Sequence, residues 1–204
     1  MINSEEIFIF GAGGHGKVVL DAALSSERNV VFIVDDNAKN NKLLNVPIKT
    51  LSSANIPNKR FVVAIGDDQT RAEKFSNILG CATPAIIIHP AAVVSAFSTI
   101  GLGSVVLSQA NVGPGSVVGA NAIVNTGAIV EHDCRIGSHS HIAPNATLCG
   151  AVTVGEYTLV GAGAVVNPGV KIGSNVKVGA GAVVVSDVPD GVTVVGCPAG
   201  IVES

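Results

Sequence analysis

Residues 121–166 read NAIVNTGAIVEHDCRIGSHSHIAPNATLCGAVTVGEYTLVGAGAVV, and their pattern repeats every six residues. Every sixth position from Val94 to Val184 is a branched aliphatic residue, without exception among sixteen positions. The residue two positions before each aliphatic is small, or is Val or Thr, and Gly often follows the aliphatic. A short fixed period of this kind indicates a stacked repeat architecture.

The six-residue period has a direct structural meaning. Two inward residues separated by one outward residue make a very short strand, because successive side chains of a strand point to opposite faces. A corner containing Gly or Asn then turns the chain, since these residues tolerate a positive φ. Each coil stacks on the previous one at about 4.8 Å. We therefore predict a parallel β-helix over residues 89–204, with an interior of aliphatic and small side chains.

Residues 1–88 follow a different pattern, in which strand and helix signals alternate. Strands are expected at 7–10, 30–34, 61–65 and 86–88, and helices at 17–24 and 69–79. Ala72, Phe75, Ile78 and Leu79 are expected on the buried face of the second helix. Alternation of this kind predicts a small Rossmann-like α/β domain with a parallel sheet.

The first predicted strand runs into a glycine-rich turn, GAGGHG, at residues 11–16. Its G-x-G-x-x-G spacing matches the dinucleotide fingerprint, and Asp35 stands at the end of the next strand, where a ribose hydroxyl is bound. A dinucleotide needs two such halves, and only about 88 residues precede the repeat. We therefore expect half of such a site, with a pyrophosphate at a helix N-terminus and a base or ribose at the acidic strand end.

This pocket for a pyrophosphate and a base or ribose is expected to consist of Gly13, Gly14, His15, Asp35, Asp36 and Gly66. Two alternatives stay open. In the first, the loop is only a tight strand-to-helix turn and binds no ligand. In the second, the loop binds the ligand, but His15 closes the loop and does not contact the ligand.

Three of the five histidines, His132, His139 and His141, cluster within ten residues. In the phase of the repeat, His132 stands at an outward corner between two carboxylates, Glu131 and Asp133. A reaction in which an amine or hydroxyl attacks needs a base that takes its proton, and histidine does this near neutral pH. A neighbouring carboxylate orients the ring. The pattern predicts a general base at His132, whereas His139 is expected to lack a catalytic function.

Composition excludes several other classes. The chain has 204 residues, of which 48% are hydrophobic and 13% charged, which is typical of globular proteins. A net charge of −3 without a basic run provides no footprint for nucleic acid. No apolar run reaches the roughly 18 residues that span a bilayer, and Met1–Glu6 lacks the basic start of a secretory signal. Four widely spaced cysteines without a CxxC pair predict reduced thiols in the cytoplasm.

Five motifs occur in order along the whole chain: GAGGHGK, VDD, AIGDD, NTGAIVEHDCRIGSHSHIAP and VVGCPAG. With the hexads, they make the chain resemble the bacterial hexapeptide acyltransferases that acetylate nucleotide-activated amino sugars or sialic acid hydroxyls. The first group comprises the bacillosamine and perosamine N-acetyltransferases. The resemblance implies a left-handed β-helix with three hexads per coil, hence about five coils. It also implies a homotrimer with active sites between adjacent subunits.

The resemblance also implies roles for individual residues. It assigns the general base to His132 and the acid that raises its basicity to Asp133. Glu131 and Asn125 match polar positions near the acceptor sugar. His141 matches a position that contacts acetyl-CoA.

Gly150 follows His132 by 18 residues, one coil, so we expect it to stack beneath the histidine. The resemblance suggests that its N–H faces the thioester carbonyl in an oxyanion-type role. Ala162 and Ala180 match backbone contacts to the CoA arm. The γ-class carbonic anhydrases share the β-helix and bind zinc with three histidines across a subunit interface. The spacing of the histidine cluster here matches no such ligand pattern, so no metal is expected.

The resulting expectation is an acetyl-CoA-dependent N-acetyltransferase that acts on a nucleotide-linked amino-dideoxy sugar, with UDP-4-amino-4,6-dideoxy-N-acetylglucosamine as the first candidate. O-acetylation of sialic acid and N-acetylation of a GDP-perosamine-type sugar are alternative activities. A nucleotide-sugar-binding scaffold without catalysis is the alternative outside enzymes, and the Glu131-His132-Asp133 cluster argues against it.

Overall fold

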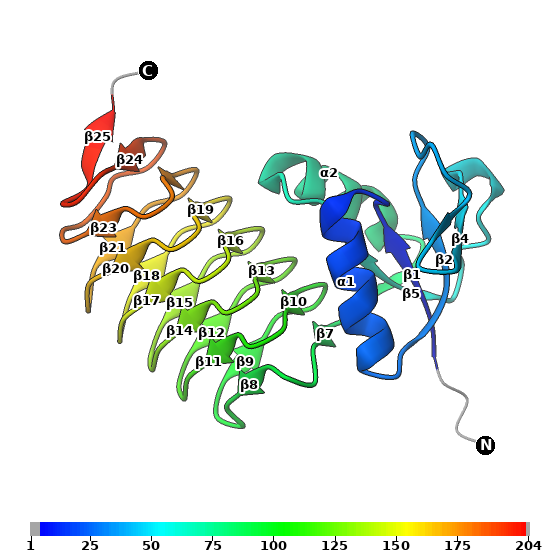
Figure 1. Cartoon of the computed structure of the whole chain (residues 1–204), viewed down its shortest axis with the longest axis horizontal. Coiled ribbons are helices and arrows are strands. Elements are labelled where there is room, and N and C mark those ends of the chain that lie inside the picture. The colour runs from blue at the N-terminus through cyan, green and yellow to red at the C-terminus, as the bar shows by residue number, and fades with distance from the viewer. Residues whose placement is uncertain (1–4, 203–204) are drawn as a thin grey trace.

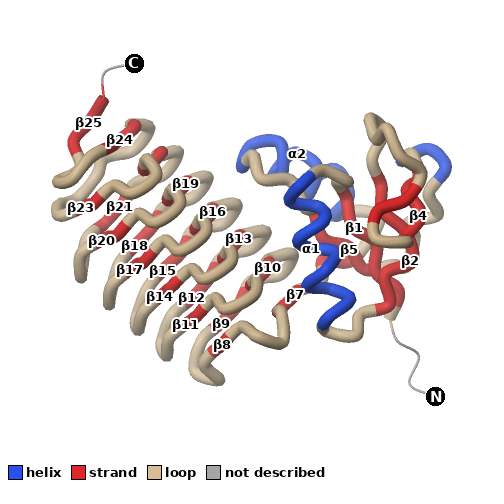
Figure 2. The backbone as a smooth tube through the Cα atoms, viewed as in Figure 1, coloured by secondary structure: helices blue, strands red, loops and turns tan. Residues whose placement is uncertain are grey.

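The structure is a computed structural model that describes residues 5–202. It consists of a small α/β unit and a long triangular coil that extends from it (Figure 1, Figure 2). Most of the segment for which a secretory signal was excluded, residues 1–4, lies outside the described residues. Within residues 5–202, neither helix is long and apolar enough to cross a membrane.

The N-terminal unit is a six-stranded sheet in the order β3-β4-β2-β1-β5-β6. Its strands are β1 (Glu6–Phe10), β2 (Asn29–Val34), β3 (Lys42–Leu43), β4 (Val46–Lys49), β5 (Arg60–Val63) and β6 (Thr83–Pro84). The helices are α1 (Gly14–Ser25) and α2 (Asp68–Leu79), and a short 3-10 helix spans Leu51–Ser53. Strand β1 pairs in parallel with β2 and β5, which confirms the predicted Rossmann-like sheet.

The two faces of this sheet carry different cores. Ile7 and Ile9 pack in one cluster with α1, and Phe8 and Phe10 pack in another with Phe75 of α2. This division follows from the alternation of side chains along β1. The α1 cluster also includes outward residues of the coil, among them Val105 and Ile123, so α1 lies between the sheet and the coil.

The apolar face predicted for α2 is partly wrong. Ala72, Phe75 and Ile78 are buried, but Leu79 is 50% exposed and Arg71 is only 1% exposed. Leu79 is the last residue of the helix, directly before the C-cap residue Gly80. Arg71 instead lies on the buried face, because its guanidinium binds backbone carbonyls at the junction with the coil.

The coil is a parallel β-helix whose two-residue strands form three faces. The first face contains β7 (Ile87–Ile88), β10 (Val105–Val106), β13 (Ile123–Val124), β16 (His141–Ile142), β19 (Leu159–Val160), β22 (Lys177–Val178) and β24 (Thr193–Val195), closed by the antiparallel β25 (Gly200–Val202). The second face contains β8 (Val93–Val94), β11 (Asn111–Val112), β14 (Ile129–Val130), β17 (Thr147–Leu148), β20 (Val165–Val166) and β23 (Val183–Val184). The third face contains β9 (Thr99–Ile100), β12 (Val117–Val118), β15 (Arg135–Ile136), β18 (Thr153–Val154) and β21 (Lys171–Ile172).

The register of the coil is 18 residues, as three hexads per turn require. Ile123 pairs with His141, and His141 pairs with Leu159 in turn. The second face stacks six strands, one per coil, so the chain makes about six coils rather than the five expected. The first face extends beyond the predicted repeat at both ends, since β7 precedes Val94 and β24 follows Val184.

The start of the repeat also corrects the predicted strand at 86–88. This segment was expected to complete the N-terminal sheet, but β7 pairs with β10 on the first face of the β-helix. Thr83–Pro84 is the edge strand of the N-terminal sheet instead. Because Ile88 precedes Val94 by six residues, the hexad pattern itself extends back to this strand.

The interior is built as the hexads predict. Val130, Ile136 and Ile142 are at most 4% exposed, and the small residues Cys134 and Ala146 are fully buried between them. Corners take a positive φ at every sixth residue. The series runs through Gly103, Gln109, Gly115, Asn121, Gly127, Asp133, His139, Asn145, Ala151, Tyr157, Gly163, Gly169, Asn175 and Gly181.

Candidate active site

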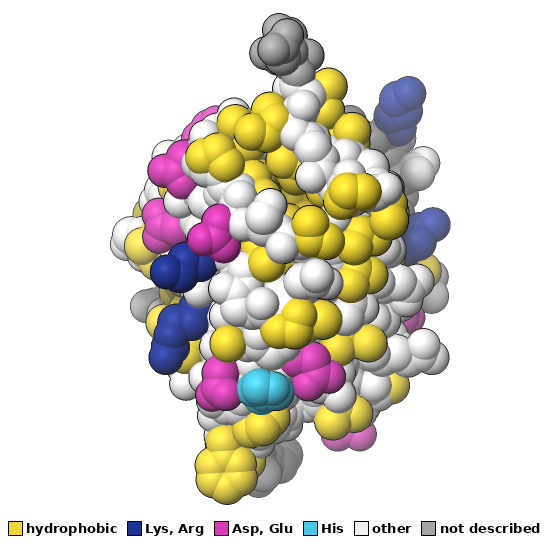
Figure 3. Space-filling model, turned by 90° about the vertical axis from the view of Figure 1, so that its left-hand side faces the viewer, with side chains coloured by type: hydrophobic (Ala, Val, Ile, Leu, Met, Phe, Trp, Pro, Cys, Tyr) yellow, Lys and Arg dark blue, Asp and Glu magenta, His cyan; other side chains and the backbone are white. Residues whose placement is uncertain are grey.

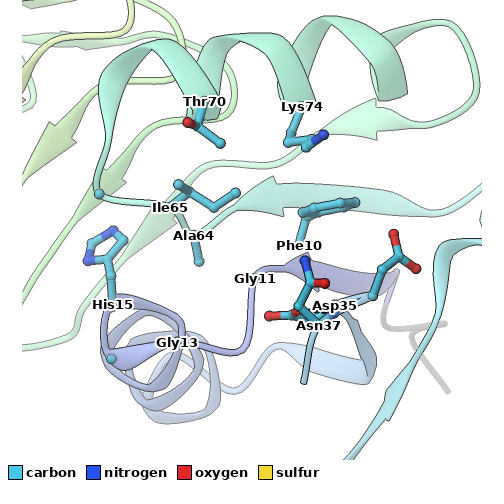
Figure 4. Close-up of a pocket in the computed structure, with 13 residues that line it drawn as sticks. Phe10, Gly11, Gly13, His15, Asp35, Asn37, Ala64, Ile65, Thr70 and Lys74 are labelled. Carbon is cyan, nitrogen blue, oxygen red and sulfur yellow. Dashed lines mark hydrogen bonds between the residues drawn. The ribbon is translucent and has the colours of Figure 1, made fainter. Parts of the chain in front are cut away.

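A cavity of about 480 Å³ opens at the carboxyl ends of β1, β2 and β5, between the first turn of α1 and α2. All six residues predicted for the nucleotide-sugar pocket line it: Gly13, Gly14, His15, Asp35, Asp36 and Gly66. Figure 4 shows Gly13 and His15 on the α1 side of this cavity and Thr70 and Lys74 on the α2 side. The predicted residues therefore share one cavity, which we call the nucleotide pocket.

The first turn of α1 provides free backbone donors in this pocket. Gly13 is the N-cap and offers no side-chain cap, so the first N–H groups of the helix lack intrahelical partners. A Cβ built on Gly13 or Gly14 would meet no atom within 4 Å, whereas one on Gly16 would lie 2.2 Å from the Gly11 carbonyl oxygen. Gly16 is thus required by the fold itself, while Gly13 and Gly14 keep the pocket open above the helix N-terminus.

The two aspartates at the end of β2 shape the pocket as well as line it. Asp35 accepts the N–H of Ala12 at 2.8 Å and that of Asn37 at 2.9 Å, one on each carboxylate oxygen. Asp36 accepts the N–H of Leu51 at 2.8 Å through Oδ1. Asp35 therefore holds the glycine loop against β2, and both carboxylates retain lone pairs towards the pocket.

His15 joins the pocket to the β-helix. Its ring centroid lies 6.2 Å from that of His141 on β16, and its Nε2 is buried without a hydrogen-bond partner among the described residues. The Nε2 of His141 lies 2.9 Å from Nδ2 of Asn125, so the amide donates and Nε2 is the unprotonated ring nitrogen. Burial, and then the charge of Arg71, lowers the pKa of His15 to about 4 and that of His141 to about 3. Both rings are therefore neutral at pH 7.

His132 occupies a different place, the corner between the second and third faces. Its side chain is 59% exposed, and Nδ1 lies 2.8 Å from the Asp133 carboxylate. Asp133 adopts a φ of 59°, a conformation that Asp tolerates better than most residues. Asp133 thus contacts the ring at Nδ1, which leaves Nε2 free of this contact. Figure 3 shows a histidine flanked by acidic side chains on the surface of the β-helix.

Gly150 lies directly against this histidine. A Cβ on Gly150 would stand 2.4 Å from Nε2 of His132, which confirms the predicted stacking of the two residues one coil apart. The next N–H, that of Ala151, donates to the His132 carbonyl at 2.8 Å. The Gly150 N–H donates to no acceptor among the described residues, so it is available to a ligand beside the histidine.

The structure divides the predicted catalytic residues between separate corners. Glu131, His132 and Asp133 are at the second–third corner, whereas Asn125 is at the first–second corner and contacts His141. The N-terminal unit covers the first face, and the second–third corner is the edge of the prism opposite that face. Hence a single chain does not bring His132 to its own nucleotide pocket.

The remaining predicted positions also have defined places. Ala162 and Ala180 lie at the first–second corner, in consecutive coils, joined by a hydrogen bond from Gly181 N–H to the Ala162 carbonyl. His139 packs face to face with Tyr157 at 4.8 Å, and its Nδ1 lies 2.8 Å from Nδ2 of Asn121. His139 is thus held by contacts within its own chain.

The three clustered histidines do not converge within one chain. His132 and His139 lie at different corners, and His141 lies on a strand of the first face. Among residues 5–202, no group of three His, Cys, Asp or Glu side chains is arranged to hold a metal ion.

Sequence reasoning missed Arg71, which is buried at the junction of the two units. Its guanidinium donates to the carbonyls of Ile65 and Asn121 at 3.0 Å and pairs with Asp68 at 2.6 Å. The signal was present in the sequence, since Arg71 shares the i, i+4, i+7 spacing of Phe75 and Ile78 on the buried face of α2. Asn37, Thr70 and Lys74 of the nucleotide pocket were also not predicted.

The fold defines a class: a hexapeptide-repeat transferase with a Rossmann-like α/β unit in front of the β-helix. Comparison with known families agrees. The profile of the PglD N-terminal domain matches residues 6–78, and that of the bacterial transferase hexapeptide, six repeats, matches residues 115–150 and 151–186.

Solved structures of similar proteins cover the whole chain. The acetyltransferase domain of PglB from Neisseria gonorrhoeae is 36% identical with a TM-score of 0.93, over 97% of this chain and all of that one. PerB from Caulobacter crescentus, solved with CoA and GDP-perosamine, is 38% identical with a TM-score of 0.91, over 97% of both chains. The chain therefore belongs to the hexapeptide-repeat sugar acetyltransferases with a PglD-type N-terminal domain, and its coil is their left-handed β-helix.

A curated relative supports the same family over a shorter stretch. UDP-N-acetylbacillosamine N-acetyltransferase of Bacillus subtilis is 36% identical over 112 residues. That alignment spans 51% of this chain and 52% of the relative, about half of each.

Proposed function

We propose that this protein transfers the acetyl group of acetyl-CoA to the amine of a nucleotide-linked amino-dideoxy sugar. The observation that carries the proposal is the pairing of the nucleotide pocket with the His132–Asp133–Gly150 corner in one chain of this family. Relatives solved with acetyl-CoA, and with CoA and GDP-perosamine, support this choice of substrates. The first candidate acceptor is UDP-4-amino-4,6-dideoxy-N-acetylglucosamine.

In this proposal the N-terminal unit, taken as residues 1–88, binds the nucleotide. The pyrophosphate accepts hydrogen bonds from the free N–H groups at Gly13, Gly14 and His15, where the helix dipole also favours an anion. Asp36 and the unoccupied lone pairs of Asp35 receive ribose or base donors. This end of the molecule provides binding energy and orientation rather than proton transfer.

The chemistry is assigned to the second–third corner. The sugar amine attacks the thioester carbonyl carbon, and Nε2 of His132 takes a proton from the nitrogen as the C–N bond forms. The free N–H of Gly150 stabilises the oxyanion, and the C–S bond then breaks to release CoA, whose sulfur receives the proton from His132. Asp133 stabilises the imidazolium and Glu131 contacts the acceptor sugar from the same corner, while Asn125 contacts the sugar from the first–second corner of the neighbouring chain.

Acetyl-CoA is proposed to lie along the β-helix. His141 contacts it on β16, and the backbone of Ala162 and Ala180 lines the path of its arm at the first–second corner. These two alanines are one coil apart, so a pantetheine chain running along the helix axis passes both.

We propose a homotrimer, because the site is incomplete in one chain. His132 is on the edge opposite the face that carries the nucleotide pocket, so a neighbouring chain has to supply it. A cytoplasmic location fits the acetyl-CoA requirement and the four cysteines, all of which are free thiols.

Activity is tested by incubating the purified chain with acetyl-CoA and UDP-amino, GDP-amino or sialic acid acceptors while free thiol is followed. We expect thiol release with a nucleotide-linked amino sugar and none with sialic acid or without an acceptor. Release with sialic acid alone would replace the proposal with O-acetylation, and release with none of the acceptors would reject it.

Co-expression of two defective variants, His132→Ala and Gly14→Val, tests whether two chains share each active site. If each site combines the pocket of one chain with His132 of the next, random trimers regain about a quarter of the wild-type sites. If both parts came from the same chain, every site would stay defective. Light scattering on the same samples gives the oligomeric state, and an active monomer would exclude the trimer.

A further inference from the structure

Arg71 of α2 joins the two units through several polar contacts. Nη1 donates to the carbonyls of Ile65 and Gly66 at 3.0 and 3.1 Å. Nε donates to the carbonyl of Asn121 at 3.0 Å, and Nη2 donates to that of His139. One planar group thus binds the loop after β5 and the β-helix at the same time.

On the β-helix side, Arg71 contacts two residues that are already joined to each other. Asn121 and His139 stand one coil apart at the corner between the third and first faces, and their side chains are joined at 2.8 Å. Phe75 of α2 packs against the edge of the His139 ring, with ring centroids 6.0 Å apart. The guanidinium therefore spans two consecutive coils that are already linked to each other.

The loop side of the contact is the wall between two cavities. Gly66 lines the nucleotide pocket, and it also lines a second cavity of about 470 Å³ with Tyr157, Asn175 and Lys177 of the β-helix. A hydrogen bond from the His141 ring to the Gly66 backbone opposes the burial that lowers the pKa of this histidine. The position of Gly66 is thus set by Arg71 and by the first face of the β-helix.

We propose that Arg71 is a positioning residue that fixes the nucleotide pocket relative to the β-helix. Its guanidinium binds the backbone of Gly66 on one side and the backbone of Asn121 and His139 on the other. The inference rests on the proposed function, because the consequence of this alignment is acetyl transfer. A displacement of about 1 Å at a reacting centre can cost on the order of 10²-fold in rate, so alignment between the units is expected to control turnover.

The chemistry of arginine suits this task better than that of lysine. Arg presents five donors in a fixed plane, whereas Lys offers a single ammonium that cannot hold carbonyls on opposite sides. The buried charge is balanced by Asp68 at 2.6 Å. Burial lowers the pKa values of His15 and His141, and the same charge adds to this shift.

The test compares Arg71→Met and Arg71→Lys with Arg28→Met, a matched control at an exposed arginine. For Arg71→Met we expect kcat, normalised to folded chains, to fall by about tenfold or more, while the calorimetric Kd values for UDP or GDP and for CoA stay within about threefold. Arg71→Lys should recover part of the loss, and Arg28→Met should match the wild type. If Arg71→Met does not fold, Arg71→Lys carries the test with the same expected direction.

Hydrogen–deuterium exchange provides a readout that does not depend on activity. Exchange of residues 64–68 and 139–141 should rise together in Arg71→Met, with the start of α1 unchanged. If the wild type acetylates no amino sugar but this paired rise occurs, the proposed function fails and the positioning role stands. An unchanged kcat per folded chain, or unchanged exchange in both segments, would overturn the positioning role.

Discussion

The imidazole of His132 lies directly over the backbone of Gly150, one coil further along the β-helix, with no room for a Cβ between them. The 18-residue register makes the two corners stack, and the absent side chain leaves space for the ring. This relationship places a free N–H beside the nitrogen that would act as the base.

Gly150→Ala should therefore displace the His132 ring, because the new Cβ would stand 2.4 Å from Nε2. We expect kcat to fall by about tenfold or more, since the base and the oxyanion donor both lose their positions. Steady-state kinetics with thiol detection measures this. Gly80→Ala is the control, because its Cβ would meet nothing within 4 Å, and equal effects of the two variants would contradict the role of Gly150.

His132→Ala should lower kcat by roughly 10²-fold or more while the protein still folds and binds both substrates. The side chain is exposed at a corner, so its removal leaves the buried Val130 and Ile136 unchanged. Asp133→Asn should cost less, because it only orients and polarises the ring. Calorimetric binding of CoA and nucleotide checks the integrity of each variant, and near wild-type turnover in His132→Ala would reject the general-base assignment.

Gly14→Val should weaken nucleotide-sugar binding and leave acetyl-CoA binding nearly intact. The structure has open space at this position, so the valine contacts only a ligand at the helix N-terminus. Gly16→Ala is the structural comparison, since its Cβ would lie 2.2 Å from the Gly11 carbonyl oxygen. It should lower the melting temperature, whereas Gly14→Val should not. Calorimetry showing equal losses for both ligands in Gly14→Val would make the loop structural only.

Acid should destabilise the fold through the two buried histidines. Their folded-state pKa values, about 4 for His15 and about 3 for His141, lie below the ordinary value of 6.5, so the unfolded chain binds protons first as pH falls. The stability associated with the neutral rings is therefore present above pH 6.5 and is lost progressively as pH falls towards about 4 for His15 and about 3 for His141. Melting temperatures of the wild type and of His15→Gln across this range measure the effect. The variant should show the weaker pH dependence, and identical slopes would contradict the prediction.

The sequence by itself determined the β-helix, the parallel sheet and six of the residues that line the nucleotide pocket. The reason is that each depends on short-range spacing. Hexads repeat inward positions such as Val130 and Ile136, and a glycine turn between a strand and a helix places its N–H groups at the end of the sheet. The pairing of His132 with Gly150 was also predictable, because the repeat length equals one coil.

Only the tertiary structure decided how these parts meet. Arg71 is bound by carbonyls of residues 50 and 68 positions away, and no local period encodes such contacts. The strand at 87–88 differs, because the six-residue step from Ile88 to Val94 already indicates that it belongs to the β-helix, where it pairs with β10. His132 lies on the edge opposite the nucleotide pocket because the N-terminal unit covers the first face of the β-helix. The unit covers that face because α1 packs against its outward apolar residues, such as Val105 and Ile123.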